Sequence, residues 1–164
     1  MIGPVAGAQT MERGSHVREA LRTGTAETHQ ALDALWDGKS LAERGHYLRF
    51  LAASAAALLP IEAGLAASRI DILVPDWPLR RRSDAITADL AGFGVAVPAS
   101  DPVAFGSPNA MLGTLYVLEG GGLWRSFLER LDEADPTELE LAAMIAGARD
   151  AFARFDAAAR RALA

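Results

Sequence analysis

The histidine near the N-terminus, His29, is the residue best placed for chemistry, because it lies among apolar residues and has Asp33 four positions later. Residues four apart share one face of a helix, so a helix here brings the Asp33 carboxylate within reach of the imidazole. A carboxylate that accepts one ring N–H fixes the tautomer and leaves the other nitrogen free to bind a metal. His29 is therefore a candidate metal ligand; the alternative is a structural histidine satisfied by its neighbouring carboxylate.

A long helix has to carry this pair. At about 100° per residue, one arc of that helix collects a largely apolar set of side chains: Leu21, Thr25, Leu32, Leu35 and Trp36. His29 lies at the edge of this arc. We predict that His29 faces the interior, with Asp33 one turn further on.

The bounds of this helix are predicted from residue types. Ser15 is a suitable N-cap, and Asp37 and Gly38 provide a stop after Trp36. Residues 1–14 lack the basic segment and apolar core of a secretory signal, so we predict a flexible leader, within which Met11 is an alternative start. The domain is then expected to span residues 15–164.

Glycines mark two places where a helix is weakened. Gly24 costs its helix roughly 1 kcal/mol relative to alanine, and indicates either a close approach by another element or a tolerated defect. Gly120, Gly121 and Gly122 are three successive glycines after an apolar segment. There the helix either ends, or it bends so that its backbone approaches a neighbouring group closely.

The other segments also favour helices. A capping box at residues 40–43 predicts the start of a second helix, kinked near Pro60, and another at 137–140 predicts the start of the last. Residues 70–78 are expected to form a connector from which Trp77 covers the core, with a helix over 79–91 after it. Ser107 and Pro108 are typical of a helix start. No segment alternates with period two, so we predict an all-α, single-domain bundle of about six helices.

Composition excludes several classes of function. The formal net charge of −5 argues against a nucleic-acid partner, and the absence of cysteine excludes thiolate chemistry. No run of about 18 uninterrupted apolar residues occurs, so we predict no membrane span and a cytoplasmic protein. The motifs of hydrolases, P-loops and zinc proteases are missing. A single neutral imidazole is the usual protein ligand of a haem iron, which keeps that possibility beside the structural one.

The basic run at residues 80–82 departs from this acidic balance. It is either a solvated helix start or a cluster that pairs with the carboxylates of a ligand. On charge alone, Arg80 and Arg82 are the candidates for that second role. Tyr116, on the helix after Ser107, is by position a core residue.

Two motifs resemble the bacterial haem oxygenases, particularly the branch associated with bacteriophytochromes. The first spans residues 21–33 and reads L-R-x-x-T-x-x-x-H-x-x-L-D. The second spans residues 113–120 and reads G-x-L-Y-V-L-E-G. Weaker agreement lies between them, at residues 47–51, 59–62 and 76–90.

This resemblance implies the all-α haem oxygenase fold, with haem held between the first helix and the glycine-bearing one. The implied reaction is the oxidative cleavage of haem to biliverdin, carbon monoxide and ferrous iron, with an external electron donor and a bacteriophytochrome as a partner. His29 matches the iron ligand of the family. The other expected haem-binding residues are Asp33, Thr25 and Tyr116, to which charge adds Arg80 and Arg82.

The resemblance breaks down after the second motif. Gly120, Gly121 and Gly122 match the start of the family's distal helix, whose small residues place backbone over the haem. That helix usually continues Ser-x-Leu-Gly-Gly, whereas residues 121–125 read G-G-L-W-R. An alternative alignment treats residues 123–128 as a later helix, with the rest of the distal helix deleted. The second expected function is therefore a relative that binds haem, another tetrapyrrole or a protein partner without turnover.

Overall fold

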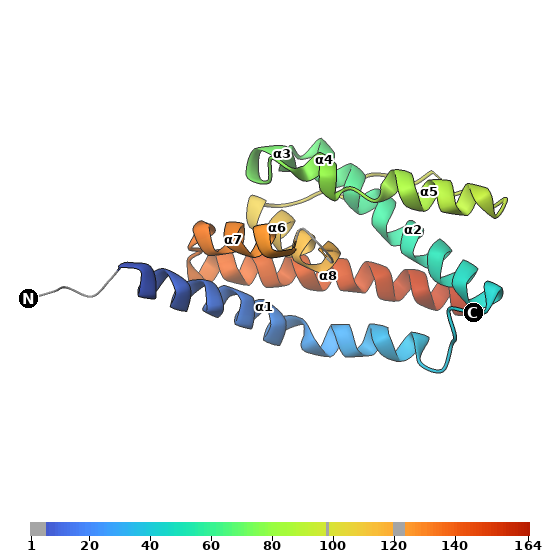
Figure 1. Cartoon of the computed structure of the whole chain (residues 1–164), viewed down its shortest axis with the longest axis horizontal. Helices are drawn as coiled ribbons and strands as arrows, with labels where there is room; N and C mark the ends of the chain where they lie inside the picture. Colours follow the sequence, from blue (N-terminus) through green and yellow to red (C-terminus); the bar gives the residue numbers. More distant parts are fainter. Residues whose placement is uncertain (1–5, 98, 120–123) are drawn as a thin grey trace, which may run out of the picture.

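Every regular element in the described part of the chain is a helix (Figure 1). The computed structural model describes residues 6–97, 99–119 and 124–164. The helices are α1 (Ala6–Trp36), α2 (Arg44–Ala67), α3 (Ile70–Leu73), α4 (Trp77–Arg80), α5 (Ser83–Gly92), α6 (Pro108–Leu118), α7 (Trp124–Ala134) and α8 (Glu138–Leu163). The all-α prediction is confirmed.

Three long helices form the frame of the molecule. α1 and α8 lie side by side along the long axis, and α2 packs on α8 and carries α5 (Figure 1). The shorter α6 packs along α8, and α7 lies against the N-terminal half of α1. The frame therefore brings the first and the last helix of the chain, α1 and α8, into one layer.

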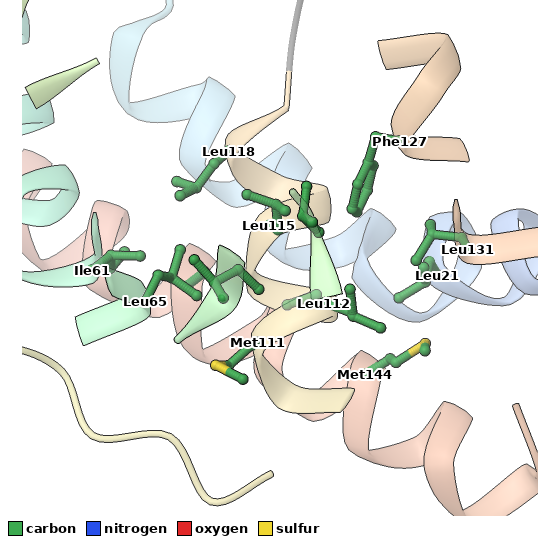
Figure 2. Packing of buried hydrophobic residues seen from close by; sticks show 14 of the residues in the cluster. Leu21, Ile61, Leu65, Met111, Leu112, Leu115, Leu118, Phe127, Leu131 and Met144 are labelled. Carbon is green, nitrogen blue, oxygen red and sulfur yellow. The ribbon is translucent and has the colours of Figure 1, made fainter. Parts of the chain in front are cut away.

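The main core forms where α6 meets its neighbours (Figure 2). Its buried side chains come from seven helices and include Leu21 of α1, Ile61 and Leu65 of α2, Ile70 of α3, Trp77 of α4, Met111, Leu112, Leu115 and Leu118 of α6, Phe127 and Leu131 of α7, and Met144 of α8. Burial of each such side chain contributes roughly 1.5–3 kcal/mol. The apolar face that the sequence places on each helix is what holds the helices together.

Glycines allow the helices of this core to pack closely. A Cβ added to Gly113 of α6 would collide with the carbonyl of Met144, and one added to Gly147 of α8 would collide with that of Ala110. A Cβ on Gly24 would lie 2.8 Å from the side chain of Ile145. Of the two alternatives at Gly24, the structure supports the close approach, and its partner is α8.

Several predicted helix ends are wrong. α1 begins at Ala6 instead of Ser15. α2 begins at Arg44, because the Ser40 hydroxyl accepts from Ala42 N–H in the preceding turn and caps no helix. α2 contains Pro60 and runs on to Ala67, and the predicted kink at Pro60 stays a prediction. The division of the chain at residue 15 stays a prediction.

The connector over residues 70–78 also differs from its prediction, because it contains α3 and the start of α4. Trp77 is buried as predicted, although from a helical turn. The predicted caps of the helices that begin after Ser107 and Thr137 are confirmed. Ser107 Oγ accepts from Ala110 N–H at 3.1 Å, and Thr137 forms a reciprocal capping box with Glu140.

α2 is long and apolar enough to cross a membrane by length and composition. Half of that apolar window is buried within the protein, however. Its buried side chains include Leu58, Ile61 and Leu65, which belong to the main core. Packing in the bundle thus accounts for the buried half of this window.

Candidate functional site

A cavity of about 470 Å³ lies between α1, α2, α5, α8 and the end of α6. This volume falls within the range of roughly 300–1,000 Å³ that is usual for small-molecule sites. Its apolar wall is mostly aliphatic and includes four aromatic side chains: Trp36, Phe50, Phe152 and Phe155. The polar side chains in the lining are Asp33, Ser54, Arg82 and Asp89. The cavity is therefore an apolar slot with a few charged groups at its boundary.

His29 lies at the edge of this cavity, outside the lining itself, against two residues of its wall. Its Nδ1 is 3.0 Å from Asp33 Oδ2, and its ring meets the ring of Phe152 edge-on, with 5.7 Å between centroids. Both Asp33 and Phe152 line the cavity. The predicted pairing of the imidazole with the carboxylate is thus present, and Nε2 is the ring nitrogen left to bind a metal.

The prediction that His29 faces the interior is wrong, since its side chain is 59% exposed. Over residues 16–36 of α1, where side chains are described, the buried ones are Val17, Leu21 and Thr25, which are spaced by four residues. Each such step turns the helix by about 400°, so the line drifts by about 40° per step. His29 is the next residue in this line and has drifted out of the packed interface to the cavity edge.

Thr25 and Tyr116 lie away from the cavity lining. Thr25 is buried, and its hydroxyl donates to the carbonyl of Leu21 at 2.8 Å. Tyr116 is half-buried close to Arg18 and Arg22 of α1, and burial raises the pKa of its hydroxyl. The next residue, Val117, is the one on α6 that lines the cavity.

Arg80 is held inside the protein. Its guanidinium pairs with Asp76 at 2.8 Å and with Glu119 at 2.9 Å, and it donates to Ser126 Oγ at 2.8 Å. The hydrogen bonds from Arg80 hold the pKa of Asp76 below its usual value. Arg80 is not in the cavity lining, and its contacts tie α4 to the end of α6 and to α7.

Arg82 does line the cavity. Its backbone N–H donates to the buried carboxylate of Glu62 at 2.9 Å, as does the N–H of Ser83. Its guanidinium donates from Nη2 to the carbonyl of Leu118 at 2.7 Å. The structure thus separates the two arginines that charge alone had grouped.

Gly120, Gly121 and Gly122 lie outside the described residues, so their predicted role stays a prediction. The aromatic residues of the wall and Asp89 were not predicted as site residues. Each aromatic residue lies on the apolar face of a predicted helix, where core and cavity residues have the same pattern. Only the gap between the packed helices distinguishes them.

No family model matches the chain, and no curated protein matches it. Among solved structures, the chain is similar to the NO- and CO-bound haem oxygenase from Neisseria meningitidis. The TM-score is 0.75 and the identity 20%, over 89% of this chain and 91% of that chain. At this identity the likeness shows the fold, and the chain has a haem oxygenase-like all-α fold.

Proposed function

We propose that the chain binds haem in the cavity between α1 and α8, with His29 as the protein ligand to the iron. The observation that carries this proposal is the His29–Asp33 pair, at the edge of an apolar cavity with aromatic side chains in its wall, within a haem oxygenase-like fold. The proposed reaction is the oxidative cleavage of haem to biliverdin, carbon monoxide and ferrous iron.

The residues present fit a haem. Four aromatic side chains provide part of the wall for a flat macrocycle: Trp36, Phe50, Phe152 and Phe155. Within the described ranges, no three His, Cys, Asp or Glu side chains gather as a metal site. A metal held by His29 therefore needs most of its ligands from outside the described side chains, as the four porphyrin nitrogens provide.

This chain's own residues supply binding and orientation. Asp33 Oδ2 lies 3.0 Å from Nδ1 of His29. A carboxylate in this position favours the tautomer with the proton on Nδ1, which leaves Nε2 for the iron. The apolar wall excludes water from the macrocycle. Bound haem, with electrons and dioxygen, supplies the oxidative chemistry that opens its own ring. An external electron donor, a bacteriophytochrome partner and a cytoplasmic location belong to the same proposal.

A second candidate function is haem or tetrapyrrole binding without turnover. The observation that favours it is the sequence of residues 121–125, which departs from the glycine-rich distal helix of the haem oxygenases. The two candidates share the His29 site and differ only in whether the bound haem is cleaved.

Titration of the purified protein with hemin tests the shared site. We expect a shifted Soret band for the wild-type protein, the same shift for His16→Ala, and no such shift for His29→Ala. His16 is a matched control because it is an exposed histidine on the same helix. The absence of a wild-type Soret shift, or an unchanged shift in His29→Ala, would overturn the proposal.

The complex is then reduced with ascorbate in air. We expect the Soret band to fade and a bilin absorbance to appear, which supports cleavage. A Soret band that persists under these conditions rejects cleavage and selects the second candidate.

A further inference from the structure

Arg82 lies between two features of the fold: the cavity on one side and the end of α6 on the other. Leu118 is the last residue of α6. Its carbonyl is one of the helix-end acceptors that lack a partner within the helix, and it accepts from Arg82 Nη2 at 2.7 Å. The arginine therefore acts as the cap of α6 while it lines the cavity.

The backbone of Arg82 is held by contacts that do not involve the Arg82 side chain. Glu62, which is 2% exposed, accepts from the N–H groups of Arg82 and Ser83 and from the Ser83 hydroxyl. The carboxylate of Glu62 is thus occupied by the start of α5. Because that anchor holds the backbone, a substitution of the Arg82 side chain leaves the start of α5 in place.

Arg82 differs in charge from the other ionisable residues around the cavity. It is the one Lys or Arg among the described residues in the lining, which also includes Asp33 and Asp89. A ligand carboxylate is repelled by both aspartates and by the C-terminal end of the α6 dipole. The guanidinium offers five donors in a planar fork, of which the Leu118 carbonyl uses one.

We propose that Arg82 binds a carboxylate of the tetrapyrrole while it caps α6, so that the ligand's carboxylate stabilises the end of that helix. This inference rests on the proposed function and adds two properties to it. The site selects a tetrapyrrole with free carboxylates over its neutral ester. Binding of the tetrapyrrole with free carboxylates orders the C-terminal turn of α6, whereas binding of the ester does not.

Binding of hemin and of hemin dimethyl ester, measured in the same dilute detergent, tests the first property. We expect wild-type protein to prefer hemin by about tenfold, as one charge-assisted hydrogen-bonded pair provides. Arg82→Gln should lower this preference to about one by weakening hemin binding alone. Arg81→Gln is the matched control, because Arg81 is the exposed neighbour outside the lining, and it should keep the wild-type preference.

Amide hydrogen exchange over residues 112–119 tests the second property. We expect slower exchange at the end of α6 with hemin than with the ester at equal saturation, and no such difference in Arg82→Gln. Equal protection by the two ligands in wild-type protein would overturn the coupling. Thermal unfolding of each variant confirms that it is folded.

These results separate the two levels of the proposal. If the Soret shift depends on His29 but wild type and Arg82→Gln prefer hemin over its ester equally, the role of Arg82 is overturned. Haem binding is then still supported. No Soret shift in wild-type protein overturns both.

Discussion

The pair formed by His29 and Asp33 is the smallest unit of the proposed site. Nδ1 of His29 lies 3.0 Å from Asp33 Oδ2, although both side chains are more than half exposed. Because solvent competes for such a pair, it contributes little to folding stability. Its expected effect is on the direction of the imidazole and on which nitrogen carries the proton.

Substitution Asp33→Asn separates orientation from folding. We expect hemin affinity to fall by about 10- to 100-fold, the range found when a histidine ligand loses its carboxylate partner. The unfolding free energy should hardly change. Asp37→Asn is the control, since Asp37 is an exposed carboxylate beyond the end of α1 and outside the cavity lining. Equal hemin affinities for Asp33→Asn and wild type would show that the carboxylate does not orient the ligand.

At the scale of elements, the crossing of α6 and α8 lies beside the cavity. Gly113 meets the backbone of Met144 and Gly147 meets that of Ala110, so the two helices touch through main-chain atoms. Val117 and Phe152 lie further along the same two helices and line the cavity. The spacing of the helices at the glycines therefore fixes the separation of α6 and α8 on that side of the cavity.

We predict that Gly147→Ala forces α8 away from α6. Since the added Cβ would meet the backbone of Ala110, the expected loss in the free energy of unfolding is about 1–3 kcal/mol. Gly92→Ala is the control: nothing lies within 4 Å of its Cβ, and its φ is not in the left-handed region. Urea unfolding measures both, and an unchanged midpoint for Gly147→Ala would contradict this account of the crossing.

At the scale of the whole molecule, buried charges add to the apolar contacts that join α4, α6 and α7. Arg80, with a side chain 1% exposed, links α4 to Glu119 and to Ser126 of α7. Asp76 supplies the partly exposed carboxylate of the same network. Its depressed pKa makes the global stability depend on pH.

The direction of this dependence comes from the pKa of Asp76, which is lower in the folded protein than in the unfolded chain. The stabilisation is present above the unfolded value of about 3.9 and is lost as pH falls through the folded value. Asp76→Asn should lower the unfolding free energy by about 1–2 kcal/mol near neutral pH. Its acid-induced loss of stability should also be smaller than in wild type. Parallel pH profiles from urea unfolding would refute the link.

Local sequence signals predicted those features that depend on neighbouring residues. The helical class comes from apolar spacing, and the caps at Ser107 and Thr137 come from hydrogen bonds across three residues. The pairing of His29 with Asp33 needs only one turn of helix. The box at residues 40–43 failed because the Ser40 hydroxyl closes a turn two residues away, which the same residue types permit equally well.

Only the tertiary structure decided which of these residues reach the cavity. Arg80 and Arg82 are two positions apart, yet one enters a buried ion-pair network and the other lines the cavity and caps α6. His29 lies at the cavity edge because the packed line on α1 drifts away from it. Aromatic residues on three helices line the cavity, although each has the pattern of a core residue. Sequence spacing determines the face of a helix, whereas the crossing of distant helices determines what that face meets.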